Sequence, residues 1–251
     1  MGVSFATGYI NNHRVYMSVS SFNVKLLEKK IRVSSWWSLA SAMPDSHYNE
    51  TSGIMLTHHL EAVYNNIEDI FSRPETGFYK DLFTLLKKVR MNKEQVKNEL
   101  KIVSLLHDIG KTKEDKQQVI PHPLTGKPAH MRHGIVGLMA TMEIIGNDLI
   151  PFPQQQKNIY RTVELHDISY GLFREFNVTG NIPHKDKLHY IGNKIHEIPS
   201  IGLLYLLVFK LADTHGHDNI SDIIWFYNVA QEKHFSHLNI NLPVPEEKDI
   251  R

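Results

Sequence analysis

Histidine and aspartate are the residues of this sequence best suited to chemistry. The chain of 251 residues contains 16 histidines and no cysteine, which excludes disulfide scaffolds, thiol nucleophiles and cysteine-ligated metals. A histidine-rich chain without cysteine points to metal ligation by nitrogen and oxygen or to acid–base work. The strongest local signal is the run HDIGK at 107–111, where His107 and Asp108 end an apolar helical pattern. At a helix end, two adjacent side chains can reach one metal.

Four further side chains of this kind fall on the apolar faces of predicted helices: His59, His133, His166 and Asp213. His59 lies one turn before Val63 and therefore faces inward, whereas the same periodicity turns His58 outward. Asp213 ends the apolar segment 201–212, and a carboxylate there is costly unless it is paired or bound to a metal. Each residue alone has a simpler reading as a core or surface residue. Their joint inward phase on separate helices indicates a metal site.

Helical periodicity dominates the elements that must position these residues. Residues 3–19 alternate on either side of Asn11 and Asn12 and predict a short N-terminal β-hairpin. Helices are predicted over 24–31, 36–42, 55–71, from Asn92 to Leu106, and over 133–146, 156–167, 199–215 and 219–232. Residues 111–132 are polar and proline-rich and predict a long loop. The fold class is therefore mainly α, with an extension at 1–50, a helical metal-binding domain at 51–235 and a tail at 236–251.

The net charge and the lengths of the apolar runs argue against nonspecific nucleic-acid binding and against a membrane span. Lys+Arg total 28 and Asp+Glu total 27, a net charge of +1, which does not support tight nonspecific binding to nucleic acid. The apolar run 201–209 is far shorter than the roughly 20 residues of a membrane span, and the first residues lack the pattern of a secretory signal. We expect a cytoplasmic protein without a membrane partner.

The order His59, His107-Asp108 and Asp213 resembles that of the HD-domain metal-dependent phosphohydrolases. HDIGK and the run LADTH around Asp213 carry this resemblance, and the continuation through HMRHGIVGLMA to VELHD is similar to the HD domains of CCA-adding enzymes and HD-GYP phosphodiesterases. It covers about residues 52–232. It implies an HD-type helical bundle in which His59, His107, Asp108 and Asp213 bind one ion.

The resemblance also implies a second metal site, completed by His133 and His166, with Asp108 as the bridge. Two features depart from the family pattern. LTHHLEA also aligns through His58, as in deoxynucleotide triphosphohydrolases, so His58 is the alternate first ligand. After His166 the chain reads DISYGLF, and the HD-GYP motif itself is absent.

The function expected from these ligands is hydrolysis of a phosphoester or phosphoanhydride of a nucleotide, with nucleic acid kept as an alternative substrate. One or two divalent ions (Mn, Fe, Mg, Ni, Co or Zn) suit the nitrogen and oxygen donors, and such ions activate water. Asp108 and Lys111 are the predicted catalytic residues. The predicted substrate contacts are Lys111, Lys127, His130 and Arg132.

Two other functions use a similar set of residues. Di-iron oxygenases related to the HD fold also carry four histidine and two aspartate ligands, and oxygen-dependent turnover would distinguish them. A non-catalytic nucleotide-binding module is the third hypothesis. The intact ligand set argues against it, because degenerate members of the family usually lose these residues.

Overall fold

The computed structural model describes residues 22–45, 52–113, 115, 119–121, 126, 128–196, 202–214, 221–229, 243–246 and 248. The described chain is mainly helical, as predicted. The helices are α1 Val24–Arg32, α2 Ser35–Ala42, α3 Leu56–Ser72, α4 Gly77–Lys88, α5 Lys93–Leu106, the 3-10 helix η2 Ile109–Thr112, α6 His133–Leu149, α7 Pro153–Leu165, α8 Ile168–Thr179, α9 Lys185–His196, α10 Gly202–Asp213 and α11 Ser221–Val229. The predicted hairpin at 3–19 and most of the tail 236–251 lie outside the described residues.

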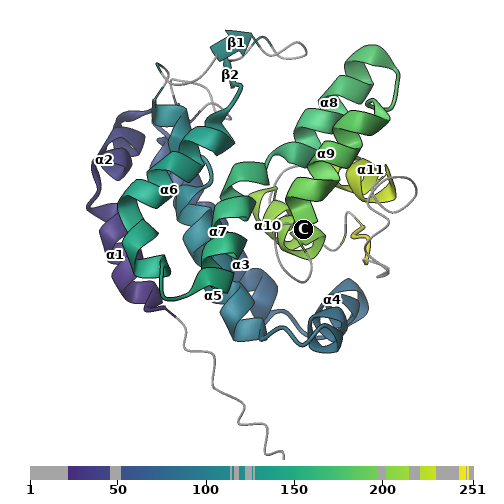
Figure 1. Cartoon of the computed structure of the whole chain (residues 1–251), viewed down its shortest axis with the longest axis horizontal. Helices are drawn as coiled ribbons and strands as arrows, with labels where there is room; N and C mark the ends of the chain where they lie inside the picture. Colours follow the sequence, from purple (N-terminus) through teal and green to yellow (C-terminus); the bar gives the residue numbers. More distant parts are fainter. Residues whose placement is uncertain are drawn as a thin grey trace, which may run out of the picture.

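Helices α3, α5, α7 and α10 form the centre of the bundle. Helices α1, α2 and α6 lie along one side of it, while α8 and α9 project from the other side next to α11 (Figure 1). None of the described helices combines the length and the apolar character needed to cross a membrane.

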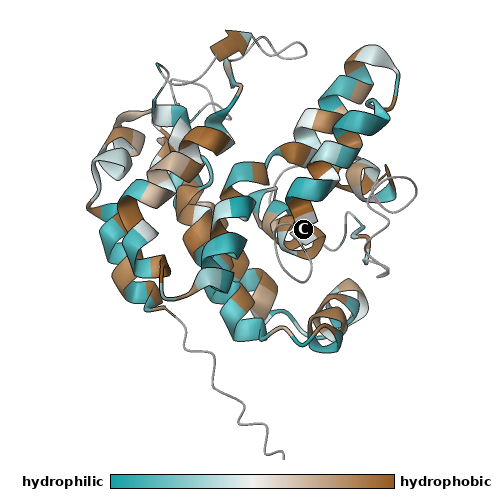
Figure 2. Cartoon of the chain, viewed as in Figure 1, coloured by the Kyte–Doolittle hydropathy of each residue, from teal (hydrophilic) through white to brown (hydrophobic). Residues whose placement is uncertain are grey.

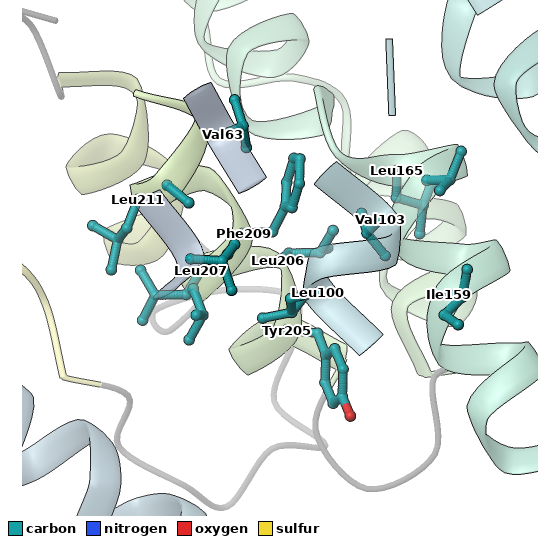
Figure 3. Close-up of a cluster of buried hydrophobic side chains, with 14 of the residues drawn as sticks. Val63, Leu100, Val103, Ile159, Leu165, Tyr205, Leu206, Leu207, Phe209 and Leu211 are labelled. Atoms are coloured by element: carbon teal, nitrogen blue, oxygen red, sulfur yellow. The ribbon is translucent and has the colours of Figure 1, made fainter. Parts of the chain in front are cut away.

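Helix α10 is the most deeply buried element, because its sequence is apolar on every face. Its residues from Gly202 to Ala212 are all buried, and Figure 2 shows apolar and polar residues alternating along the surrounding helices. Figure 3 shows Tyr205, Leu206 and Phe209 of α10 packed with side chains of α5 and α7. The two ends of α10 therefore sit at fixed positions within the core.

The side chain of Asn92 caps the start of α5, the helix that the sequence predicts from Asn92 to Leu106. Its Oδ1 accepts a hydrogen bond from the backbone N–H of Gln95 at 3.1 Å, which satisfies one of the free donors at a helix start. The second half of a capping box is absent, because the Gln95 side chain donates to Glu99 instead, at 2.7 Å. The cap sets where α5 starts and so where His107 falls at its far end.

The strands that the structure describes lie in the middle of the chain rather than at its N-terminus. β1 (Val119–Pro121) pairs antiparallel with β2 (Pro128–His130), with Ile120 opposite Ala129. The prediction of one long loop over 111–132 was therefore wrong. Val119 and Ile120 have the β-branched side chains that favour strands, and Gly126 adopts a left-handed φ of +71° between the strands.

Three helices were not among those predicted from the sequence: α4, α8 and α9. Helix α9 carries Leu188, Ile191 and Ile195 on its buried side, a spacing of three and four residues that periodicity can detect. Helix α8 ends at Gly180, whose φ of +68° is the left-handed conformation of a common helix stop. Signals for at least two of the missed helices were thus present in the sequence.

Candidate metal centre

Four predicted ligands from three parts of the chain converge at one point. His59 lies in α3, His107 caps the end of α5 with Asp108 next to it, and Asp213 is the last residue of α10. Because α3 packs against both α5 and α10, the ends of these helices meet. The side-chain amide of Asn66 in α3 donates to the backbone oxygen of Ala212 at 2.8 Å and fixes the end of α10 beside His59.

The donor atoms of this first group are spaced as ligands of one ion. His59 Nε2 lies 3.2 Å from both His107 Nε2 and Asp213 Oδ1, and His107 Nε2 lies 3.4 Å from Asp213 Oδ1. Asp108 Oδ2 is 3.7 and 3.6 Å from the same two Nε2 atoms. Four donors about 2.1 Å from one ion at tetrahedral angles lie about 3.4 Å apart. The observed spacing fits a divalent ion.

A second group shares Asp108 and uses its other oxygen. Oδ1 of Asp108 lies 3.2 Å from His133 Nε2 and 3.3 Å from His166 Nε2, and these two nitrogen atoms are 3.0 Å apart. His133 begins α6 and His166 caps the end of α7. The Asp108 carboxylate thus faces one donor group with each oxygen.

Hydrogen bonds to backbone oxygens orient three of the four histidine rings. Nδ1 of His107, His133 and His166 lies 2.9, 2.6 and 2.8 Å from a carbonyl oxygen three residues earlier in each case. A carbonyl only accepts, so Nδ1 carries the proton and each Nε2 presents a lone pair to the site. Acceptor atoms this close repel one another unless a cation or a proton lies between them. The donor set therefore fits bound divalent ions on chemical as well as geometric grounds.

Close backbone contacts at glycines bring the elements of the second group together. A Cβ atom at Gly110 would lie 2.1 Å from the backbone oxygen of His133 and 2.5 Å from the nitrogen of Gly137. A Cβ atom at Gly134 would lie 2.5 Å from the backbone oxygen of Glu164. Side chains at these positions would force η2, α6 and α7 apart. Gly110 therefore allows the close approach of η2 and α6.

Two buried lysines stabilise the ionised form of the two carboxylates. Lys111 Nζ lies 2.5 Å from Asp108 Oδ2, and Lys210 Nζ lies 2.8 Å from Asp213 Oδ2. Burial raises the pKa of each aspartate, but the lysine charge and the neighbouring histidines outweigh it and hold both pKa values well below the ordinary value. Ionised carboxylates are the form that binds metals.

The centre opens into a cavity of about 790 Å³, bounded by residues of β2, α6, α7, α8, α9 and α10. This volume lies within the range of small-molecule sites. Lys111 and Lys210 line it together with Asp167 and Asp222. Lys210 was not predicted from the sequence, although its position one turn before Asp213 in an apolar helix is a usable signal.

Comparisons with protein-family models, with curated proteins and with solved structures found no match. The centre is therefore interpreted from its own residues.

The structure separates the two alternative first ligands. His59 is buried and lies in the first donor group, whereas the ring of His58 is exposed and its Nδ1 accepts from the backbone N–H of Met55 at 3.1 Å. Asp45, not anticipated from the sequence, is buried with Oδ2 4.0 Å from His59 Nδ1. The hydrogen bond from Met55 therefore makes His58 a cap at the start of α3, on the outside of the bundle.

Two of the other predicted substrate contacts, His130 and Arg132, line the cavity. His130 is buried at the end of β2, and its backbone oxygen accepts the hydrogen bond from His133. Arg132 is exposed at the cavity wall, and Lys127 lies outside the described residues. Lys111 is the predicted contact that lies directly against a donor group.

Proposed function

We propose that this chain is a divalent-metal-dependent phosphohydrolase of the HD type, which cleaves a phosphoester or phosphoanhydride of a nucleotide. The observation that carries the proposal is the pair of donor groups joined by the two oxygens of Asp108. His59, His107 and Asp213 would hold one ion with Asp108 Oδ2. His133 and His166 would hold the other with Asp108 Oδ1.

Two divalent ions held this way would supply an activated water and neutralise phosphate charge. The residues of the chain would do the remaining work. Asp108 sets the spacing of the two groups, and the backbone carbonyls behind the rings fix the direction of each Nε2 lone pair. Lys111 lies beside Asp108 and lines the cavity, so its ammonium can bind a phosphate oxygen and offset charge that develops during cleavage.

Charge in the cavity supports hydrolysis over the oxygenase alternative. Lys111 and Lys210 are both buried and both line the cavity. Each ammonium is paired with an aspartate of the donor groups, and its remaining N–H donors can bind the oxygens of a phosphate. A non-catalytic module would bind phosphate through the same two lysines, so turnover distinguishes it from the hydrolase.

The decisive experiment is hydrolysis by the Mn²⁺- or Mg²⁺-loaded chain without oxygen. We expect turnover of at least one substrate from a panel of p-nitrophenyl phosphate, nucleoside phosphates, cyclic nucleotides and short RNA. Asp108→Ala should abolish it while circular dichroism keeps the helical signal, because the apolar core does not involve this side chain. His58→Ala is the matched control and should retain activity. Full activity of Asp108→Ala, or no hydrolysis with any metal, would overturn the proposal, and oxygen-dependent turnover would select the oxygenase.

A further inference from the structure

The cavity has a second end, away from the metal centre, that is formed by α8 and α9. Tyr170 and Phe173 of α8 and Tyr190 and Ile191 of α9 line it. Helix α8 starts directly after His166 and Asp167, and Arg174 lies about 9 Å of helix rise beyond Ile168. A molecule with its phosphate at the metal centre therefore has its other end against α8 and α9.

One aromatic side chain at this end, Phe173, is held in place by the neighbouring helix. Its ring packs against Trp225 of α11 with centroids 5.7 Å apart, and Phe176, which does not line the cavity, packs against the same Trp225 ring with centroids 5.2 Å apart. Tyr190 is 60% exposed, although it is a large aromatic residue. A preorganised aromatic wall with one open face is suited to stacking a flat ring.

Arg174 is the half-buried cation of this wall. Lys194 is paired with Glu164, and Lys210 is paired with Asp213. Arg174, by contrast, forms no ion pair within the described part of the chain, and its Nη2 lies 3.5 Å from Met131 Sδ. It lines the same cavity as Tyr170 and Phe173, with guanidinium N–H donors available to a ligand. A planar pair of N–H donors recognises two acceptors on one edge of a base.

We infer that the α8–α9 end of the cavity is a nucleobase site, where the base stacks on the aromatic wall and Arg174 reads its acceptor edge. This inference rests on the proposed function for the position of the phosphate. It narrows the substrate to a small nucleotide, because one cavity of about 790 Å³ joins the two ends and is of the size that encloses a small molecule.

The first test is kinetic and uses the Mn²⁺-loaded full chain. Nucleoside 5′-monophosphates are compared with glycerol 2-phosphate, which has a phosphate and no ring. We expect kcat/KM at least about tenfold higher for one or more nucleotides. Arg174→Ala should raise KM for that nucleotide about tenfold, with kcat and the glycerol 2-phosphate kinetics changed less than about twofold. Arg174→Lys should recover only part of the loss, since an ammonium lacks the planar fork.

Lys187→Ala is the matched control, because Lys187 is an exposed cation of α9 that pairs with Glu175. This variant should keep the wild-type kcat and KM for both substrates. If Arg174→Ala lowered kcat/KM equally for the nucleotide and for glycerol 2-phosphate, the inference would be overturned, since the arginine would then act on the phosphate or on the fold. Absence of any nucleotide preference in the wild type would also overturn it.

A second test separates the base site from the hydrolytic function. Calorimetric titration with the four ribonucleosides, which carry no phosphate, measures base binding without chemistry. We expect binding of at least one nucleoside, weakened by Tyr190→Ala and by Arg174→Ala. Nucleoside binding without any phosphoester hydrolysis would support the base site and contradict the proposed function. Hydrolysis of p-nitrophenyl phosphate with no nucleoside binding and no nucleotide preference would sink the base site alone.

Discussion

Lys111 Nζ lies 2.5 Å from Oδ2 of Asp108, the carboxylate whose two oxygens face the two donor groups. The ion pair is buried and spans one turn of η2, so Asp108 holds the ammonium of Lys111 beside the two donor groups. An ammonium donates hydrogen bonds and cannot coordinate a cation. The neighbouring histidines also lower the pKa of Asp108, so the main contribution of Lys111 is expected at the substrate.

We predict that Lys111→Ala lowers kcat/KM for phosphoester hydrolysis by about a hundredfold, the typical cost of losing one buried donor to developing charge. Metal content should stay at the wild-type value, as measured by elemental analysis of the same preparation. Lys113→Ala, whose Nζ lies over the ring of Trp36, is the control and should keep wild-type kinetics. Loss of metal in parallel with loss of activity would contradict a substrate role for Lys111.

The two donor groups predict a stoichiometry of two divalent ions per chain. His133→Ala should reduce it to one, because it removes one of the two histidine nitrogens facing Asp108 Oδ1. His58→Ala should leave it at two, since this ring is exposed outside the bundle. Titration with Mn²⁺ followed by elemental analysis measures both. A wild type that saturates at one ion, together with an active His133→Ala, would show a mononuclear centre.

The close contact at Gly110 predicts that adding one methyl group there, in Gly110→Ala, strongly lowers stability. Gly110→Ala places a Cβ against the backbone of His133 and Gly137, so η2 and α6 must separate. We expect the free energy of unfolding to fall by about 1–3 kcal/mol or more, measured by urea denaturation, with weaker metal binding. Gly171→Ala in α8 meets nothing within 4 Å, and it should be neutral or stabilising by up to about 1 kcal/mol. Equal stabilities of the two variants would refute this packing argument.

Glu99 predicts a pH dependence of stability that is independent of the metal centre. Burial raises the pKa of this carboxyl, although hydrogen bonds from Tyr205, Gln95 and Asn158 oppose the rise. The folded chain then binds this proton more tightly than the unfolded chain, so stability falls as pH rises from the unfolded pKa to the folded pKa. Above the folded pKa the contribution is constant.

Glu99→Gln removes this titration while keeping the size of the side chain. Urea denaturation of both proteins at a series of pH values starting near about 4 should show the wild type losing stability relative to the variant as pH rises. The comparison cancels groups that titrate in both proteins. A difference that is independent of pH, or that favours the wild type at higher pH, would show that the pKa of Glu99 is not raised.

The sequence by itself determined the mainly α fold, the type of each candidate ligand and the inward direction of His59. These features depend on contacts between residues three or four positions apart, so a helical period is enough to predict them. The start of α5 at Asn92 is local in the same sense. The mid-chain hairpin was missed because its strands are only three residues long, whereas α8 and α9 carried local signals that the prediction did not use.

Only the tertiary structure decided how the ligands meet. Asp213 reaches His59 because α10 packs against α3, and His133 reaches Asp108 because glycines allow η2 and α6 to touch. The placement of Arg174 in the same cavity as the candidate ligands also became visible only there. These relationships join residues far apart in the chain, and they depend on which helix faces pack together, which no local period specifies.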